Sequence, residues 1–369
     1  MLTDKIYTLT FHNSKSHGAL LQCYALNKFL INNGFDAQVI DYLPDYFKQY
    51  NQLLPIKNHE SSNVFKGFIK SILLVKYRYI LKNKFDFFKK EIKITEKRYN
   101  SINELQDDFN DNSYYICGSD QIWNPRITGN DIDDVFFLRF TNSPNKFSYA
   151  ASTGNDLSNE IVLRDKINYY LSDFKKIMLR EENVFNLLTD SNKKKSCMVS
   201  DPVFLLSKED WVSMIKEDRI YKKPYILLYN LSYNEELYNA AISLAKKRDL
   251  NIIEIERCEI KHFHKDDITK RIIASPSELL NLIYYSEYIF TNSFHGTCFS
   301  IIFNKNFSVF IDENRGERIK NLLNIFSLDV CNLKFNHLEN QIDYSSINKI
   351  IEEYTAFSRK ELLNCLEQA

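Results

Sequence analysis

The sequence predicts an α/β protein made of two Rossmann-like domains. At 369 residues the chain is too long for one ordinary hydrophobic core and suits two domains of roughly 150 to 200 residues each. Strand-like and helix-like segments alternate near the start of the chain and again from Tyr225 onward. Because helices that alternate with strands are typical of parallel sheets, each stretch predicts one sheet covered by helices.

The first alternation spans residues 5–42. The strand-like KIYTLTF leads into the loop HNSKSHG, an amphipathic helix ALLQCYALNKFLINN that ends at Gly34, and a second strand AQVIDY. A right-handed crossover makes two such strands parallel, and ligands gather at the carboxyl ends of parallel strands. We therefore expect residues 12–18 and Asp41 to lie at a ligand-binding edge.

Residues 64–99 have a different character. They carry eleven Lys or Arg against three acids, interleaved with Phe, Ile, Leu and Tyr. One interpretation is a helical hairpin, inserted at 50–100 into the first domain, with a solvated basic face. The other is a basic amphipathic surface that rests on an anionic membrane or holds a charged substrate.

Four more strands are predicted in SYYICGSDQIWNP, KFSYAAST, FKKIMLREE and SCMVSDPVFLL, before the polar stretch 207–222. We place the domain boundary in this stretch, with an N-terminal domain at 1–212 and a C-terminal domain at 213–345. The final segment, 346–369, is expected to be a helix that packs across both domains.

The second domain alternates again, with strands predicted in YILLYNL, NIIEIER, YIFTN and FSVFID and helices between them. One helix start is well specified. Ser275 is a suitable N-cap, Pro276 suits the first turn and Glu278 completes a capping box, so SPSELLNLIYY should begin a helix there.

Composition excludes several functional classes. The formal net charge of zero provides no overall field that would steer the protein to nucleic acid. The start MLTDKIYTLTF has no signal-peptide pattern, and no run approaches the ~20 apolar residues of a membrane span, so we expect a cytoplasmic protein. The seven cysteines are irregularly spaced without a CxxC pair, and HExxH is absent, which predicts free thiols and no metal site.

The segment NSFHGTCFS, residues 292–300, follows a strand and opens a helix. Amides at a helix N-terminus, here those of Gly296 and Thr297, form an anion site, and a glycine lets a ligand approach the backbone closely. His295 can donate to a phosphate or carboxylate, or act as a general acid. The alternative is a structural N-cap by Ser293 with His295 as a bystander.

Two predicted strand ends of the first domain carry polar side chains. In CGSDQIWNP, Asp120 can take a proton from a sugar hydroxyl, Gln121 lies beside it and Trp123 can stack on a sugar, unless the segment is an ordinary turn. In IMLREE, Arg180 can grip a carboxylate or phosphate, unless it pairs with its neighbouring carboxylates. Arg318, just past another strand end, has the same two interpretations.

The loop HNSKSHGALLQ holds His12, Asn13 and His17 ahead of a helix. It contains neither GxGxxG nor GxxxxGK[ST], so binding of ATP or a dinucleotide through those motifs is not expected.

Taken together, these segments resemble the polysaccharide pyruvyl transferase family. The matching stretches are TFHNSKSHGALLQCYAL, VIDY, GSDQIWNP, YAAS, LREE, DPVFLL, TNSFHGTCFSIIFNKNF and RIKNLL, in the family's order from residue 8 to about 323. The family's fold is similar to that of GT-B glycosyltransferases, in which two Rossmann-like domains face each other across a cleft. This chain has Ser16-His17-Gly18 where Asn-Tyr-Gly is common, which bears on the acceptor-side contacts.

The resemblance implies transfer of the enolpyruvyl unit of phosphoenolpyruvate onto two hydroxyls of a sugar, which forms a pyruvate ketal and releases phosphate without a metal or cofactor. We expect His295 and Asp120 to be catalytic. The residues expected to bind the donor are Arg180, Ser293, Gly296, Thr297 and Arg318. Those expected to bind the acceptor are His12, Asn13, His17, Gln121 and Trp123.

The resemblance also implies a role in bacterial capsule or exopolysaccharide assembly. The expected partners are phosphoenolpyruvate and a sugar or lipid-linked oligosaccharide, with no nucleic acid, and segment 64–99 would contact the inner face of an anionic membrane. Two alternatives stay open. One is a GT-B-like glycosyltransferase, since the same helix terminus and arginine would grip the diphosphate of a nucleotide sugar. The other is a non-catalytic glycan-binding protein with the same fold.

Overall fold

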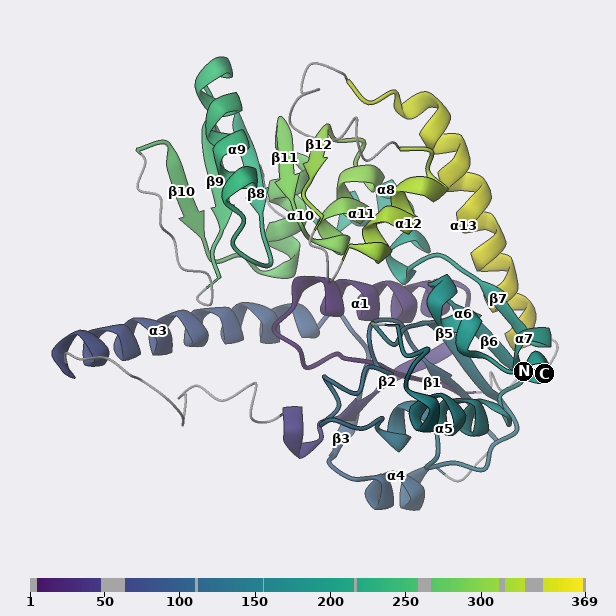
Figure 1. Cartoon of the computed structure of the whole chain (residues 1–369). Helices are drawn as coiled ribbons and strands as arrows, with labels where there is room; N and C mark the ends of the chain where they lie inside the picture. The colour runs from purple at the N-terminus through teal and green to yellow at the C-terminus, as the bar shows by residue number, and fades with distance from the viewer. Residues whose placement is uncertain are drawn as a thin grey trace. The chain divides into compact units, whose positions relative to one another are not determined.

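The computed structural model describes residues 5–47, 64–109, 112–154, 156–215, 218–257, 267–311, 316–328 and 341–367, the side chains of 64–74 excepted. Backbone contacts divide the chain into two compact units. The first unit comprises Met1–Asn51, Lys89–Leu206 and Lys349–Ala369, and the second comprises Gln52–Phe88 and Ser207–Asn348. Figure 1 shows one parallel sheet in each unit, flanked by helices.

The first unit contains a parallel sheet of seven strands in the order β3-β2-β1-β4-β5-β6-β7. Its strands are β1 (Lys5–Leu9), β2 (Asp36–Tyr42), β3 (Ile94–Tyr99), β4 (Tyr114–Cys117), β5 (Lys146–Ala151), β6 (Lys176–Leu179) and β7 (Ser196–Met198). The strand order reverses between β1 and β4, which marks the position where ligands of this fold bind.

The helices of the first unit pack around a core of buried aromatic and aliphatic side chains. They are α1 (His17–Asn32), α4 (Ile102–Asp108), α5 (Ile161–Leu171), α6 (Glu182–Leu187), α7 (Asp190–Lys194), the 3₁₀ turns η1 (Asp134–Phe137) and η2 (Pro202–Phe204), and α13 (Tyr344–Glu367), whose first residues belong to the second unit. Strands β4 and β5 are buried throughout, which explains why YYIC and KFSYAA show no polar alternation.

The second unit repeats this topology with five parallel strands in the order β10-β9-β8-β11-β12. Its strands are β8 (Tyr225–Tyr229), β9 (Asn251–Ile255), β10 (Thr269–Ile272), β11 (Tyr288–Thr291) and β12 (Phe307–Val309). Its helices are α3 (Val64–Lys89), α8 (Lys208–Ser213), α9 (Glu235–Arg248), α10 (Pro276–Tyr284), α11 (Phe294–Ile302) and α12 (Glu317–Ile325). The strand order reverses between β8 and β11. The predicted class, α/β with two Rossmann-like sheets, is confirmed.

The basic segment departs from the predicted helical hairpin. A single helix, α3, is followed by the edge strand β3, which pairs in parallel with β2. The strand sequence ITEKRY begins with two β-branched residues and exposes charged ones, as suits an edge strand. Contacts group α3 up to Phe88 with the second unit, whereas the sequence predicts the whole insert in the first domain. None of the described helices combines the length and hydropathy needed to cross a bilayer.

The start of α10 follows the predicted capping box. Ser275 accepts a hydrogen bond from the amide of Glu278, and the Glu278 carboxylate accepts one from the Ser275 amide at 2.6 Å. Two of the helix's N-terminal N–H groups are thereby satisfied.

We expect Ser275→Ala to lower the free energy of unfolding by about 1 kcal/mol, because the amide of Glu278 loses its acceptor. Urea denaturation followed by circular dichroism measures the change. Ser346→Ala, at an exposed position of α13, is the control and should change the free energy of unfolding by less than about 0.5 kcal/mol. Equal effects of the two substitutions would show that the cap contributes nothing specific.

Candidate functional site

Polar side chains gather at the carboxyl ends of both sheets. We call the carboxyl ends of β1 to β7 with the loops that follow them the first edge, and the segments that follow β8, β9, β11 and β12 the second edge. Each edge includes the point at which the strand order reverses, where α/β proteins bind their ligands.

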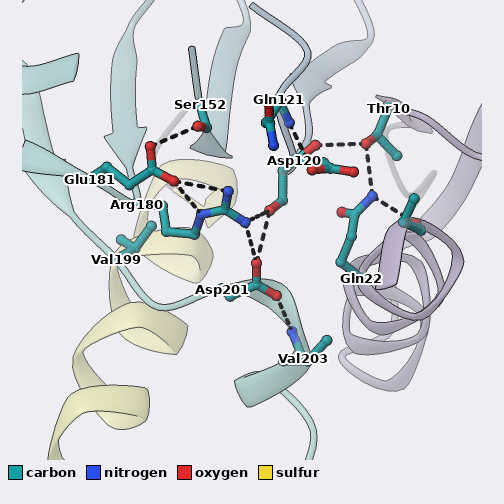
Figure 2. A network of polar contacts seen from close by, with 12 residues as sticks. Thr10, Gln22, Asp120, Gln121, Ser152, Arg180, Glu181, Val199, Asp201 and Val203 are labelled. Atoms are coloured by element: carbon teal, nitrogen blue, oxygen red, sulfur yellow. Dashed lines mark hydrogen bonds and ion pairs between the residues drawn. The ribbon is translucent and has the colours of Figure 1, made fainter. Parts of the chain in front are cut away.

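At the first edge, Arg180 lies at the centre of a buried ion network (Figure 2). Its Nη1 donates to Asp201 Oδ2 at 2.6 Å, and its Nε and Nη2 donate to Glu181 Oε1 at 3.1 and 3.0 Å. Glu181 Oε2 in turn accepts from Ser152 Oγ at 2.7 Å, and Ser119 Oγ donates to Asp201 Oδ2 at 3.3 Å. The network therefore joins the ends of β4, β5, β6 and β7.

This network corrects the prediction that Arg180 grips the donor. The side chain is 4% exposed, and its donor groups are directed at two protein carboxylates. Burial by itself would lower the pKa of Arg180, but the charges of Glu181 and Asp201 raise it above its usual value. The structure shows the alternative interpretation, in which the arginine pairs with neighbouring acids.

Asp120 lies beside this network in an uncommon backbone conformation. Its φ of 74° falls in the left-handed region, and its carbonyl accepts the amide of Ser152 at 3.1 Å. The half-buried carboxylate accepts the amide of Gln121 at 2.9 Å, while Gln121 Oε1 accepts from Asn124. Left-handed backbone at a non-glycine residue is concentrated at functional sites, so the geometry keeps Asp120 and Gln121 as candidates.

The position of Trp123 corrects its predicted role. The side chain is fully buried, its Nε1 donates to the carbonyl of Phe136 at 3.0 Å, and its ring stacks on Phe137 with centroids 5.0 Å apart. Both the ring and its N–H are therefore used by the core, and the predicted stacking on a sugar is wrong.

The ends of β1, β2 and β3 hold a second polar cluster. His12 Nε2 lies 2.8 Å from Asp41 Oδ1, Asn13 donates to the same oxygen at 2.8 Å, and Arg98 Nε donates to Oδ2 at 2.9 Å. Burial alone would raise the pKa of Asp41, but these hydrogen bonds and the nearby positive charges lower it to about 2. Lys89 fixes Asn13 by donating to its Oδ1 at 2.9 Å.

The cluster also corrects two predicted acceptor contacts. His12 is 1% exposed and His17 is 5% exposed, so neither side chain reaches a ligand directly in this structure. Asn13 is half-buried and remains a candidate. His12 acts instead as a support for Asp41.

Gln22, on α1, was missed by the sequence analysis. Its Nε2 donates to Thr10 Oγ1 and to the carbonyl of Ala19, both at 2.9 Å, which fixes the orientation of the amide (Figure 2). Its Oε1 is buried and has no hydrogen-bond partner among the described residues. The sequence signal was a glutamine on the apolar face of a helix, which pattern analysis treats as a tolerated exception.

At the second edge, the N-terminus of α11 is capped by the protein itself. Ser293 Oγ accepts the amide of Gly296 at 3.2 Å, and the Ser293 carbonyl accepts the amide of Thr297 at 2.9 Å. Both amides are therefore engaged within the helix in this structure, and their use in binding the donor stays a prediction. A Cβ on Gly296 would lie 2.5 Å from Thr291 Oγ1 and 2.9 Å from Tyr229 Cδ1, so this glycine is needed for packing against the strands.

His295 and Arg318 flank one aromatic ring at this helix terminus. The His295 ring meets Phe294 edge-on at 5.2 Å, and the Arg318 guanidinium lies over the same ring at 5.7 Å. Both side chains are half-buried. The structure thus brings together a guanidinium, an imidazole and the positive end of a helix dipole, which is an arrangement suited to an anion.

Two further residues of the second edge were missed. Asn230, directly after β8, is 2% exposed, and neither its Nδ2 nor its Oδ1 has a hydrogen-bond partner among the described residues. Arg257 follows β9; burial raises the pKa of Tyr229, and the charge of Arg257 opposes that rise. Buried side-chain amides almost always find partners, so Asn230 is unusual.

Comparison with solved structures defines the class of fold. UDP-N-acetylglucosamine 2-epimerase from Rickettsia bellii aligns over 99% of this chain and 96% of its own, with 13% identity and a TM-score of 0.51. The Neisseria meningitidis UDP-GlcNAc 2-epimerase bound to UDP-GlcNAc aligns over 99% and 100%, with 11% identity and a TM-score of 0.51. At these identities the likeness establishes the fold alone, which is of the GT-B class.

The family follows from the sequence. A family model for polysaccharide pyruvyl transferase matches residues 17–314. No curated protein gives a significant match. The chain therefore belongs to the polysaccharide pyruvyl transferase family, as the motifs predicted, and is a transferase.

We expect Asn230→Leu to raise the free energy of unfolding by up to about 1 kcal/mol, because a buried amide without partners is replaced by an apolar group of similar size. Asn281→Leu is the matched control. Asn281 is also 2% exposed, but its Nδ2 donates to the Asp218 carbonyl and its Oδ1 accepts the Ile220 amide. Its replacement should cost about 1 to 3 kcal/mol in urea denaturation. Destabilisation of similar size by both substitutions would contradict the assignment.

The lowered pKa of Asp41 predicts how stability depends on pH. Since the folded value of about 2 lies below the unfolded value of about 3.9, this carboxylate stabilises the fold fully above about pH 5 and loses its contribution as the pH falls toward 2. The urea midpoint of Asp41→Asn should therefore lie below that of the wild type at pH 6, and the gap should narrow at pH 3.5. Asp107→Asn, at an exposed position, is the control. A gap that does not change with pH would exclude the ionised form as its source.

Proposed function

We propose that this transferase moves the enolpyruvyl unit of phosphoenolpyruvate onto two hydroxyls of a sugar and forms a pyruvate ketal. Membership in the pyruvyl transferase family supports the group that is transferred. The observation that carries the donor assignment is the placement of His295 and Arg318 around Phe294 at the start of α11. The setting is the synthesis of a capsule or exopolysaccharide precursor.

The donor is a small dianion or trianion, with a carboxylate at carbon 2 and a phosphate on the enol oxygen. Arg318 supplies a guanidinium that can bind either group through two parallel hydrogen bonds. The positive end of the α11 dipole adds to the attraction for the anionic donor, although the amides of Gly296 and Thr297 already donate hydrogen bonds to Ser293. We also assign Asn230 to this site, because it follows β8, which pairs with the strand β11 that leads into α11, and because neither end of its amide has a hydrogen-bond partner among the described residues.

The proton balance of the reaction assigns two further roles. Carbon 2 gains two bonds to sugar oxygens and loses two, the π bond to carbon 3 and the bond to the phosphate oxygen, while carbon 3 gains a proton. The two hydroxyls release two protons, one of which matches the gain at carbon 3 while the other leaves with phosphate. His295 is the group that protonates carbon 3 or the leaving phosphate, and Asp120 is the base that accepts a hydroxyl proton.

The first edge is the proposed binding site for the acceptor. Asp120, Gln121 and Asn13 are half-buried residues with oxygen atoms that can accept hydrogen bonds from hydroxyl groups. The acceptor is accordingly a sugar or a lipid-linked oligosaccharide, and the reaction as written needs phosphoenolpyruvate but neither a metal nor a cofactor.

A thermal-shift titration tests the donor assignment. Phosphoenolpyruvate at 100 times its dissociation constant should add about 2.7 kcal/mol to the stability of the wild type. We expect His295→Ala and Arg318→Ala to lose most of this shift, because each removes a group that binds the anion. Lys320→Ala, which alters an exposed cation of the same helix as Arg318, should keep it.

UDP-GlcNAc, titrated in parallel, distinguishes the proposal from glycosyl transfer. A shift with UDP-GlcNAc and none with phosphoenolpyruvate would overturn the proposed donor. A phosphoenolpyruvate shift that persists in both variants would keep the donor but remove the site at α11.

A further inference from the structure

Helix α3 has two sides that both carry aromatic residues. One side is buried and consists of Tyr77, Leu81, Phe85 and Phe88. It is fixed within the second unit by polar contacts, since Tyr77 Oη donates to the carbonyl of Glu256 at 2.9 Å. This side accounts for the packing of the helix.

The opposite side forms a solvent-exposed stripe. Lys76, Tyr79, Asn83 and Phe87 follow one another at intervals of three or four residues, which places them along one face of the helix, and Lys90 directly follows the helix end. Tyr79 is 56% exposed and Phe87 is 66% exposed, and a lysine stands at each end of the stripe. We call these five residues the α3 stripe. Both rings therefore present apolar surface to solvent.

The net charge of α3 is strongly positive. The helix sequence contains seven Lys or Arg and one acid, Asp86, which gives a net charge of 7 − 1 = +6. The whole chain has 48 basic and 48 acidic residues, so the rest of the protein carries 0 − 6 = −6. A negatively charged surface would therefore attract this helix and repel the remainder of the chain.

We infer that the α3 stripe docks on an anionic lipid bilayer. Aromatic side chains flanked by lysines suit the membrane interface, because the rings enter the boundary between headgroups and acyl chains while the ammonium groups stay at the phosphates. A second copy of the chain does not fit the same surface, since it would bring two helices of charge +6 together. This inference is independent of the proposed donor.

The experiment measures the co-sedimentation of the full chain with vesicles. We expect the wild type to bind vesicles made of equal parts phosphatidylglycerol and phosphatidylcholine at low salt. It should bind at least about tenfold more weakly to pure phosphatidylcholine vesicles, or to the mixed vesicles in 0.5 M NaCl, where the charges are screened. The double variant Tyr79→Ser/Phe87→Ser should lose about tenfold in affinity for the mixed vesicles.

A matched control comes from α5. Val162 is 81% exposed and Tyr169 is 66% exposed, so Val162→Ser/Tyr169→Ser removes a similar apolar area from another helix and should bind like the wild type. Unchanged circular dichroism establishes that both variants are folded. The inference is overturned if the wild type does not sediment with the mixed vesicles. It is also overturned if the α3 variant binds as well as the α5 control, or if light scattering shows that the stripe instead joins two copies.

Discussion

The buried charge of Arg180 is the constraint on which the first edge depends. Its ion pairs to Glu181 and Asp201 connect the ends of adjacent strands, and Ser152 extends the network to β5. Loss of one partner from such a pair would leave an uncompensated charge in the interior, at a cost of about 3 to 5 kcal/mol. The strand ends are therefore held in one arrangement. The backbone of Asp120, joined to Ser152, can keep its left-handed conformation against this rigid support.

At the second edge, hydrogen bonds between uncharged groups hold the strand ends and the start of α11 together. Thr291 Oγ1 donates to the carbonyl of Tyr229 at 2.6 Å and accepts the amide of Ser293 at 3.0 Å, while Ser293 caps α11. Gly296 lets the helix approach the strands closely. The backbone at this edge is thereby satisfied by uncharged groups of the protein itself.

Much of the fold could be predicted because local signals and tertiary structure agree. The capping box at Ser275 and the apolar strand YIFT followed by the Ser293 cap are recognisable in short windows of sequence. The strand β3 was not predicted, because its charged, half-exposed sequence resembles the polar face of the preceding helix. A single sequence gives no indication of which neighbour an edge strand will pair with.

The site was harder to predict than the fold for a related reason. The sequence does not distinguish an arginine or tryptophan that faces a ligand from one that faces the core. The direction of the side chain depends on the tertiary packing around it. Arg180 and Trp123 turned inward, toward carboxylates and Phe137, whereas Arg318 stayed half-buried over Phe294. Asn230 and Gln22 stand out only once the partners of each buried polar atom can be counted.

The two edges differ in the sign of their local charge. This difference supports the proposal that one edge binds the acceptor and the other binds the donor. In the buried network of the first edge the acids Glu181, Asp201 and Asp120 outnumber Arg180, so further oxygen acceptors there favour a neutral ligand rich in hydroxyl groups. At the second edge the groups around Phe294 are a guanidinium, an imidazole and a helix N-terminus, all of which attract anions. The proposed reaction, which joins an anionic donor to a polyhydroxyl acceptor, needs both environments. Placing them on separate sheets lets each stay electrostatically suited to its own substrate.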